Sequence, residues 1–432
     1  MPNHATRWAV AGLVVLCAGC GTSSTPESTA PPVDTPTEPP DTVACAPYAG
    51  TPTTALRYFE GTMHEHTSYS DGDILSVPAD VFAQAKERGN SFVGASDHSD
   101  TLDAGVFISV GSDCFTTPDG LLTCLTPAGT DSLAKWSATA EQIAAASDDD
   151  FLAIRGFEWT SDRFGHINVY FSQNFSNAKT DGGYFATLET FWSWLSRAPD
   201  AVGAGGSATA PVPFGGGADG LAHFNHPTDK CLADDDPGCD WYQFELVPAV
   251  VEQMFGMELY NGGGRRDRYV DSFHTALDRG WRLSPIGSED EHGTDWGGDG
   301  LAKTVTLATD LSEAAFREAW SARRTYAQVA GTHLEIAFQA ADHPMGSELQ
   351  CEPGTAVPVT ASVRHTAGGP FAGTLQLVTS AGEVIAESAT EQLSTTVTSG
   401  DTRRWYYLRV NNPDGESLAF AAPVWIEPPT TP

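Results

Sequence analysis

Histidines and carboxylates at the ends of short apolar runs are the residues of this chain best suited to do chemistry. His64 and His66 close the first such run, and because side chains alternate along a strand, both imidazoles are expected on the same side. Two imidazoles on one side can hold a divalent metal ion. A His-x-His pair alone is a modest signal, because surface or packing histidines also occur in this pattern.

Further residues of metal-ligand type follow, each at or near the end of an expected strand. They are Asp71, Asp97, His98, Glu158, His166, His223, His226, Asp290 and His292. In α/β barrels the carboxyl ends of the strands converge on one face, so these groups are expected to meet in one pocket. Imidazole and carboxylate are ligands that zinc, manganese and iron accept, and a carboxylate can bridge two ions. Glu158 is the best candidate for such a bridge.

The elements that must position these groups alternate between strand-like and helix-like segments from Leu56 to about Val329. Strands are expected at 57–63, 91–95, 151–156, 166–171, 221–224, 257–260 and 282–286, and a helix at 79–88. This alternation favours a parallel α/β sheet or barrel. Beyond Gly331, alternating apolar segments with Gly and Pro between them indicate an all-β sandwich.

The order of the ligand-type residues resembles the PHP superfamily, named for polymerase and histidinol phosphatase. The resemblance rests on His64-x-His66-Thr67, Ser70-Asp71-Gly72, Ser96-Asp97-His98, Gly156-x-Glu158, His226-Pro227 and Ser288-x-Asp290-x-His292. It looks closest to an exported bacterial branch of unknown function. The fold that it implies is a distorted (β/α)7 TIM-like barrel over residues 45–330, with the small all-β sandwich over residues 331–432.

The resemblance also implies two to three divalent ions, either zinc, manganese or iron. The first would be held by His64, His66, Glu158 and Asp290, the second by Glu158, His166 and His226, and the third by Asp71, His98 and His292. His223 competes with His226, and the neighbouring Pro227 favours His226. Asp97 stands beside a ligand and is expected to orient a histidine, and Glu158, Asp290 and Asp97 are the expected catalytic carboxylates.

The chemistry implied by the resemblance is hydrolysis of a phosphorylated small molecule or a phosphodiester. Metal ions lower the pKa of a bound water, and the resulting hydroxide attacks phosphorus in line. Arg265 and Arg266 are candidates for contacting the phosphate, although a solvated basic loop is the simpler interpretation. Two alternatives stay open: hydrolysis of an amide or ester bond, and a non-catalytic surface binding protein with a retained metal pocket.

The charge balance restricts the partners. The formal net charge of −33, from 56 acidic and 23 basic residues, argues against a nucleic acid or an anionic membrane held by surface charge. Divalent ions reverse the local field, so a phosphate substrate is not excluded.

The first 20 residues have the layout of a secretory signal: Arg7, an apolar run too short to cross a bilayer, and small residues before Cys20. This start resembles a bacterial lipobox, which implies a lipidated Cys20 and a protein anchored in the bilayer of the bacterial cell envelope, at the outer membrane. Cys17 stands where lipoboxes usually have leucine, and an ordinary cleaved signal is the alternative. Residues 21–44, rich in Thr and Pro, are expected to form a disordered tether.

Six cysteines remain after Cys20, and an even number in an exported protein favours disulfides. Short loops would be closed by Cys114 with Cys124 and by Cys231 with Cys239, which leaves Cys45 and Cys351 as the third pair. Six cysteines allow fifteen pairings, so the connectivity stays open. Zinc binding by these cysteines is a weaker interpretation, because no CxxC pair is present among them.

Overall fold

The computed structural model describes residues 45–47, 55–102, 114–116, 122–124, 134–178, 187–201, 215–230, 236–263 and 268–429. These residues belong to one compact unit, Val43–Pro432. The expected signal and tether, with Cys20, lie outside the described residues, as do Cys231, Arg265 and Arg266. In the part of the chain that is described, no helix has the length and apolar character needed to cross a membrane.

A mixed sheet carries the chain's candidate ligands. Its central strands follow the order β11 (Lys303–Ala308), β2 (Arg57–Glu65), β3 (Phe92–Ala95), β6 (Leu152–Ser161), β7 (Gly165–Tyr170), β8 (Leu221–Phe224), β9 (Met254–Asn261) and β10 (Ser284–Ser288). Within this order, β2, β3, β6, β8, β9 and β10 run parallel, whereas β7 is antiparallel to both of its neighbours. The carboxyl ends of the parallel strands therefore share one edge of the sheet.

The sheet curls so that its last strand returns to its first ones. The Glu289 backbone NH donates to the Met63 carbonyl at 3.2 Å, which links the end of β10 to β2. The Thr304 hydroxyl of β11 donates to the Gly287 carbonyl at 2.7 Å. The fold is thus a mixed α/β fold around a curled sheet. The antiparallel β7 departs from a simple alternation of parallel strands and helices, and the seven-fold barrel stays a prediction.

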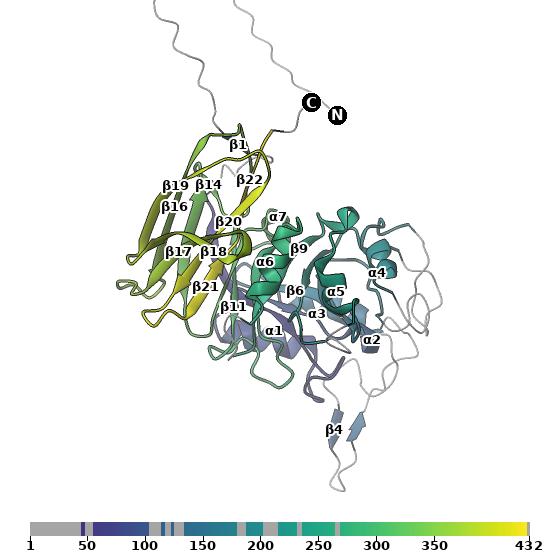
Figure 1. The fold of residues 1–432 in the computed structure, drawn as a ribbon. Coiled ribbons are helices and arrows are strands. Elements are labelled where there is room, and N and C mark those ends of the chain that lie inside the picture. The colour runs from purple at the N-terminus through teal and green to yellow at the C-terminus, as the bar shows by residue number, and fades with distance from the viewer. Residues whose placement is uncertain are drawn as a thin grey trace, which may run out of the picture. The chain divides into compact units, whose positions relative to one another are not determined.

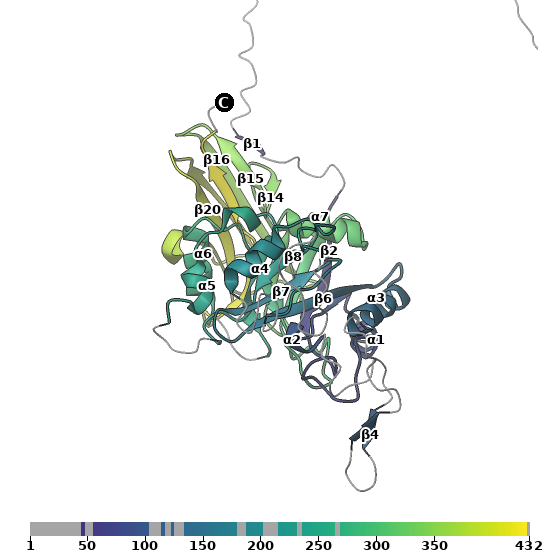
Figure 2. The same cartoon turned by 90° about the vertical axis from the view of Figure 1, so that its right-hand side faces the viewer.

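Helices pack against this sheet. They are α1 (Pro78–Glu87), α2 (Ser99–Leu102), α3 (Ala134–Ala146), α4 (Leu188–Leu195), α5 (Cys239–Phe244), α6 (Val270–Asp278) and α7 (Glu313–Ser321). Local sequence sets their ends: Pro78 opens α1, and the hydroxyls of Thr187 and Ser312 accept backbone NH groups at the starts of α4 and α7. Helices α1 and α3 lie side by side (Figure 2).

An apolar cluster fills the inside of the curl below the ligand-bearing edge. Trp320 of α7 is fully buried there and stacks on Phe255 of β9 with ring centroids 4.9 Å apart. Phe92 and Tyr170 pack against the same tryptophan from β3 and β7. Because this packing joins strands from both ends of the sheet order, it fixes the curvature that brings the strand ends together.

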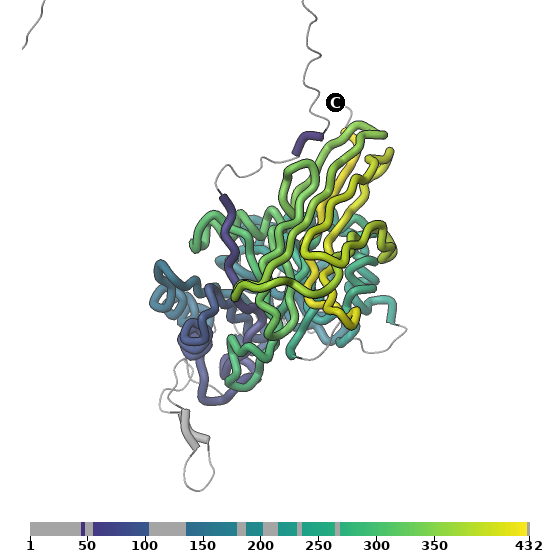
Figure 3. Tube along the Cα trace, turned by 90° about the vertical axis from the view of Figure 1, so that its left-hand side faces the viewer, coloured from purple at the N-terminus to yellow at the C-terminus, as the bar shows by residue number. Residues whose placement is uncertain are grey.

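The chain after residue 330 is built from strands, with one 3-10 turn at Ser380–Gly382. They are β13 (Leu334–Ala340), β14 (His343–Pro344), β15 (Glu348–Cys351), β16 (Ala356–His365), β17 (Thr374–Thr379), β18 (Glu383–Ser388), β19 (Gln392–Thr398), β20 (Arg404–Asn411), β21 (Ser417–Ala421) and β22 (Val424–Glu427). Figure 3 shows these green to yellow strands running side by side. Burial alternates along β13 and β16, as expected for strands with one face on a core.

This region is not separated from the α/β part by a gap in the sheet. Strand β12 (Thr325–Gln328) pairs with β11 on one side and with β21 on the other, so one sheet runs through both parts. Helix α6 also lies beside the region after residue 330 (Figure 1). His274 of this helix stacks on Trp405 and Tyr407. The expected boundary at residue 330 therefore falls within one shared sheet, and two separate domains stay a prediction.

One disulfide joins two distant parts of this unit. Cys45 is bonded to Cys351 across 306 residues, and β1 (Cys45–Pro47) pairs antiparallel with β15. Cys239 is also disulfide-bonded, and its expected partner Cys231 lies outside the described residues. The backbones of Cys114 and Cys124 face each other across the hairpin of β4 (Cys114–Thr116) and β5 (Leu122–Cys124). Cys45 and Cys351, the third pair in the prediction from sequence, are thus bonded and join the two ends of the described unit.

Candidate metal centre

The nine residues expected to be metal ligands gather at one edge of the curled sheet. They form four groups, and within each group the ligand atoms all lie within 4.8 Å of one another. They are His66–Asp71–His98–His292, His64–His226–Asp290, His64–His66–Glu158 and His98–Glu158–His166. Glu158 belongs to two of these groups and is fully buried, which is the position that a bridging carboxylate needs.

Glu158 lies at the centre of this cluster, which is called the histidine cluster below. Its Oε1 is 3.0 Å from His64 Nε2, 3.0 Å from His166 Nδ1 and 3.3 Å from His226 Nε2. Its Oε2 is 2.6 Å from His98 Nδ1. The Asn225 side chain also donates to Oε1, at 2.7 Å, and thereby orients the carboxylate. Four imidazoles thus lie within hydrogen-bond distance of one carboxylate, and His66 Nε2 lies 3.9 Å from its Oε2.

Two more carboxylates complete the cluster. Asp290 Oδ1 lies 3.2 Å from His66 Nε2 and 3.4 Å from His64 Nε2. Asp71 Oδ1 lies 3.3 Å from the Nε2 atoms of both His98 and His292. The Asp71 side chain is 58% exposed, whereas Glu158 is fully buried, so the cluster is closed towards the sheet and open towards solvent at Asp71.

Buried ligand atoms without partners show that this cluster fits divalent metal ions. Two of these buried atoms, His166 Nε2 and His226 Nδ1, have no hydrogen-bond partner among the described residues. Leaving a buried polar atom unpaired costs about 1–3 kcal/mol, so two such atoms in one place need compensation. Imidazole nitrogen and carboxylate oxygen are the donors that zinc, manganese and iron accept.

The charges of the cluster perturb the pKa values of its members. Burial by itself would lower the pKa of His64, but Asp290, Glu158 and Glu258 outweigh it and hold that pKa well above its ordinary value. Burial likewise opposes the charged form of His98, yet Glu158 and Asp71 raise its pKa to about 10. Burial and the neighbouring His98 lower the pKa of His66 to about 3. In the metal-free cluster, the raised pKa values favour protonated His64 and His98, whose positive charges offset the carboxylates; bound metal ions would offset the same charges.

The backbone at three cluster residues is strained. His64, His226 and Asp290 have φ values of 70°, 25° and 51°, in the left-handed region that costs a non-glycine residue about 1–3 kcal/mol. The expected reason for the shared direction of His64 and His66, regular alternation along a strand, is therefore not the one observed. The β2–β3 register shifts between Thr62 and Glu65, and Glu65 turns away from the cluster towards Thr62.

Glu258 holds this strained backbone and was not among the expected ligands. It is fully buried in β9, its Oε1 lies 2.7 Å from His64 Nδ1, and its Oε2 accepts the His226 backbone NH at 2.7 Å. The surrounding histidines, above all His64, outweigh the burial of Glu258 and lower its pKa to about 2. A carboxylate that fixes the far nitrogen of a metal-binding histidine sets its tautomer and orientation. Its place near a strand end was the signal in the sequence.

Tyr170 supports the same strand end from below. Its hydroxyl accepts the His64 backbone NH at 3.2 Å and the Asn168 side chain at 2.9 Å. Its ring needs the space beside Gly156, where a Cβ atom would lie 2.4 Å from the tyrosine ring. The glycine two residues before Glu158 thus has a packing role.

Asp97, expected to orient a histidine and to take part in catalysis, lies behind the loop that follows His66. Its carboxylate accepts the Thr67 backbone NH at 2.7 Å, the Thr67 hydroxyl at 2.8 Å and the Ser70 hydroxyl at 2.6 Å. Ser70 Oγ is in turn 3.3 Å from His66 Nδ1. Asp97 therefore reaches His66 through Ser70, as a positioning residue would, and its catalytic role stays a prediction.

Strand direction explains the position of His166, and local packing that of His223. Because β7 is antiparallel to β6, its first residues, with His166, lie at the edge where the parallel strands end. His223 lies within β8, stacks on Tyr170 with ring centroids 5.7 Å apart, and is absent from the four groups of described ligand atoms. Burial lowers the pKa of His223 to about 4. The geometry therefore favours His226, as the neighbouring Pro227 indicated.

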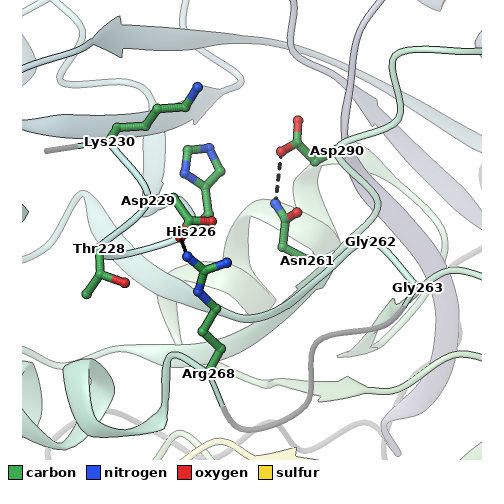
Figure 4. A pocket seen from close by; sticks show the side chains of 9 residues that line it. All are labelled: His226, Thr228, Asp229, Lys230, Asn261, Gly262, Gly263, Arg268 and Asp290. Carbon is green, nitrogen blue, oxygen red and sulfur yellow. Dashed lines mark hydrogen bonds and ion pairs between the residues drawn. The ribbon is translucent and has the colours of Figure 1, made fainter.

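A pocket of about 740 Å³ adjoins the cluster at His226 and Asp290 (Figure 4). Its other lining residues are Thr228, Asp229, Lys230, Asn261, Gly262, Gly263 and Arg268. Asn261 donates to Asp290 at 3.1 Å and to Glu258 at 3.1 Å. The volume of the pocket lies in the range of small-molecule sites, about 300–1,000 Å³. The expected phosphate contacts Arg265 and Arg266 lie outside the described residues, and their role stays a prediction.

Neither a protein-family model nor a curated protein matches this chain. Among solved structures, it is similar to a two-domain protein from Bacteroides vulgatus that contains a predicted PHP-like metal-dependent phosphoesterase, with 17% identity, a TM-score of 0.42 and coverage of 87% of this chain and 97% of that chain. It is also similar to PsfC from Pseudomonas syringae, with 12% identity, a TM-score of 0.31 and coverage of 62% and 88%. Both likenesses are distant, so the function of this chain has to be inferred from its own site.

Proposed function

We propose that this protein is a metal-dependent phosphoesterase that hydrolyses phosphate mono- or diesters with metal-activated water. The observation that carries the proposal is the histidine cluster, in which six imidazoles and three carboxylates face one another around the buried Glu158. The proposed ligands are the nine residues named by the sequence: His64, His66, Asp71, His98, Glu158, His166, His226, Asp290 and His292. Two to three ions are the proposed complement.

When bound, such ions supply a hydroxide near neutral pH and polarise phosphoryl oxygens. The residues of this chain prepare the place for that chemistry. Glu158 offers one oxygen to each side of the cluster, and Glu258 fixes the ring of His64 from behind. The half-exposed Asp71 leaves the solvent side open, and the pocket beside His226 gives a substrate room next to the ligands.

The pocket favours a phosphoester over the alternative amide or carboxylic ester. Its described lining is polar or glycine and includes two cations, of which Arg268 is paired with Asp229 and Lys230 forms no ion pair with a described residue. Cationic side chains bind the charged oxygens of phosphate by charge-assisted hydrogen bonds, whereas a neutral amide gains less from them. A non-catalytic binding protein remains the second alternative, and turnover separates it from an enzyme.

The proposal includes export and a lipid anchor at Cys20. Two observations within the described residues support the export part, the Cys45–Cys351 disulfide and the disulfide-bonded Cys239, because disulfides persist mainly in oxidising compartments. The anchor rests on the sequence before Gly21 alone. Replacing Cys20 by serine should move the protein from the membrane fraction to the soluble one, and an unchanged fractionation would contradict the anchor.

Metal content and hydrolysis of the compact unit, residues 43–432, test the enzymatic part. Elemental mass spectrometry should find about two to three ions per chain after incubation with zinc, manganese or iron, and few in the variant His64→Ala/His66→Ala. The loaded protein should cleave p-nitrophenyl phosphate or bis(p-nitrophenyl) phosphate faster than p-nitrophenyl acetate. Faster cleavage of the acetate would favour the carboxylic ester reading. A chain that binds no metal, or binds it and cleaves nothing, would refute the proposal.

A further inference from the structure

The pocket beside the histidine cluster contains charged groups that the ligand set does not use. Lys230 and Arg268 are its cations, and Asp229 and Asp290 are its carboxylates. Asp290 faces the imidazoles of His64 and His66. The remaining three groups decide what else the pocket can bind.

The positive charge of Arg268 is offset by a carboxylate of the same chain. Its guanidinium forms an ion pair with Asp229, and the Tyr269 hydroxyl donates to the other oxygen of Asp229 at 2.8 Å. Figure 4 shows the Arg268 side chain directed at Asp229. A cation held in this way keeps its neighbours in place but has little charge left for a ligand.

Lys230 is different. It is exposed and makes no hydrogen bond or ion pair with a described residue. The three other described lysines all have partners: Lys86 pairs with Asp148, Lys135 donates to two backbone carbonyls, and Lys303 pairs with Glu289. The chain has only 5 lysines and a net charge of −33, so a lysine beside the cluster with no ionic partner among the described residues is not an average surface feature.

The backbone that leads to Lys230 is held from three sides. The His226 NH donates to Glu258, the Thr228 NH donates to Asp240 at 2.7 Å, and Asp229 is held by Arg268 and Tyr269. His226 and Thr228 have left-handed φ values of 25° and 70°, which persist only where the surroundings impose them. The position of Lys230 relative to His226 is therefore set by the fold.

We propose that Lys230 binds a phosphoryl oxygen of the substrate in this pocket, and that the substrate is a small phosphorylated molecule. This inference rests on the proposed function and names its substrate class. In Figure 4 the Lys230 ammonium lies on the same side of the pocket as the His226 ring and the Asp290 carboxylate. A phosphate held by ions at the cluster thus presents its remaining charge to this ammonium. A polyanion such as nucleic acid would instead meet the repulsion of the whole chain.

Binding of inorganic phosphate tests the inference without turnover. Isothermal titration calorimetry on the metal-loaded protein should give a Kd about 10-fold higher for Lys230→Gln than for the unchanged chain, and a smaller change for Lys230→Arg, which keeps the charge. Lys86→Gln, which removes an exposed lysine far along the chain, is the matched control and should bind phosphate normally. The metal content of all four proteins should be the same.

Steady-state kinetics on p-nitrophenyl phosphate give a second readout. Lys230→Gln should raise KM about 10-fold and change kcat less, because the contact is made in the ground state as well as during reaction. Equal phosphate affinity and equal KM in Lys230→Gln and the unchanged chain would overturn the role of Lys230 and leave the proposed function standing. Cleavage of an oligonucleotide with a lower KM than the small ester would overturn the substrate class. If the metal-loaded chain neither binds phosphate nor cleaves the ester, the proposed function itself fails.

Discussion

Two clusters of buried charge lie next to each other in this protein and are balanced in different ways. One is the histidine cluster around Glu158. The other, called the carboxylate–lysine trio, consists of Glu65, Glu289 and Lys303. The same chain segments supply both, because Glu65 stands between His64 and His66 and Glu289 precedes Asp290. The two clusters therefore share chain segments but differ in composition.

The negative charge of the two carboxylates in the trio is offset by groups of the chain itself. Lys303 pairs with Glu289 and donates to the Gly298 carbonyl at 2.7 Å, while Glu289 also accepts the Gly297 NH at 2.7 Å. The Thr62 hydroxyl donates to Glu65 at 2.6 Å. Burial and the adjacent Glu289 raise the pKa of Glu65 well above its ordinary value, which favours its neutral form. One ammonium and one retained proton thus offset two carboxylates.

Among the described residues, the three carboxylates of the histidine cluster form their ion pairs with imidazoles and not with a lysine or an arginine. These carboxylates raise the pKa values of His64 and His98, which favours protonated rings, and His166 Nε2 and His226 Nδ1 have no hydrogen-bond partner among the described residues. The comparison teaches that buried charge is structural where the chain supplies the counter-charge. Where buried donors are left unpaired together, they indicate a place for ions that the chain does not itself supply.

The largest effect is expected when the central carboxylate of the histidine cluster is removed. Glu158→Gln keeps the shape of the side chain but removes the charge that faces four imidazoles, so metal content should fall and phosphoester hydrolysis should drop on the order of 10⁴-fold. Elemental analysis and initial rates measure both effects. Glu313→Gln on the exposed start of α7 is the control and should change neither. Retention of all ions in Glu158→Gln would contradict a bridging role.

The opposite expectation holds for the trio. Lys303→Met leaves Glu289 buried without its counter-charge, and breaking a buried pair in this way costs about 3–5 kcal/mol of the free energy of unfolding. Urea denaturation of the metal-free protein should show this loss, while the folded fraction still binds its ions. Lys86→Met, which breaks an exposed pair, should have little effect. Loss of metal binding without loss of stability in Lys303→Met would show that the two clusters are not separate.

Glu258 links the strained strand end to the histidine cluster and should have an intermediate effect. Glu258→Gln weakens the hydrogen bond that fixes His64, so metal affinity should fall about 10- to 100-fold. A competition titration against a chromogenic chelator measures the affinity. The ions should still bind at full stoichiometry at high metal concentration. An unchanged affinity would mean that Tyr170 and the surrounding packing alone hold His64.

The last expectation concerns the dependence of metal binding on pH. In the metal-free protein, nearby carboxylates raise the pKa values of His64 and His98, the latter to about 10, so these rings carry protons at neutral pH. Metal binding must displace those protons, and affinity should therefore rise with pH between 6 and 8, by about 10-fold per unit for each proton released. Calorimetry in buffers of different ionisation enthalpy counts the protons. Binding without proton release would contradict the assignment of these histidines as ligands.

The candidate site could be anticipated from the sequence because its ligands are few, chemically distinctive and placed at strand ends. The expected strand at 221–224 matches β8, the expected helix at 79–88 is displaced by one residue from α1, and all nine expected ligands lie together. Apolar periodicity and turn residues are local signals, so they can be recognised without knowing the fold. Strand β11 and its hydrogen bonds to β2 and β12 were not anticipated, because pairing partners far apart in sequence leave no local signal.

The sequence by itself determined which groups can bind metal and in what order they occur, because residue type and spacing carry that information. Tertiary structure decided the rest. It made β7 antiparallel, which brought His166 to the edge where the other strands end, and it turned His64, His226 and Asp290 into left-handed backbone. It also placed Glu258 behind two of these residues and Asp97 behind a loop. Strand direction, backbone strain and hydrogen-bond partners follow from the packing of the whole unit, and no short segment contains them.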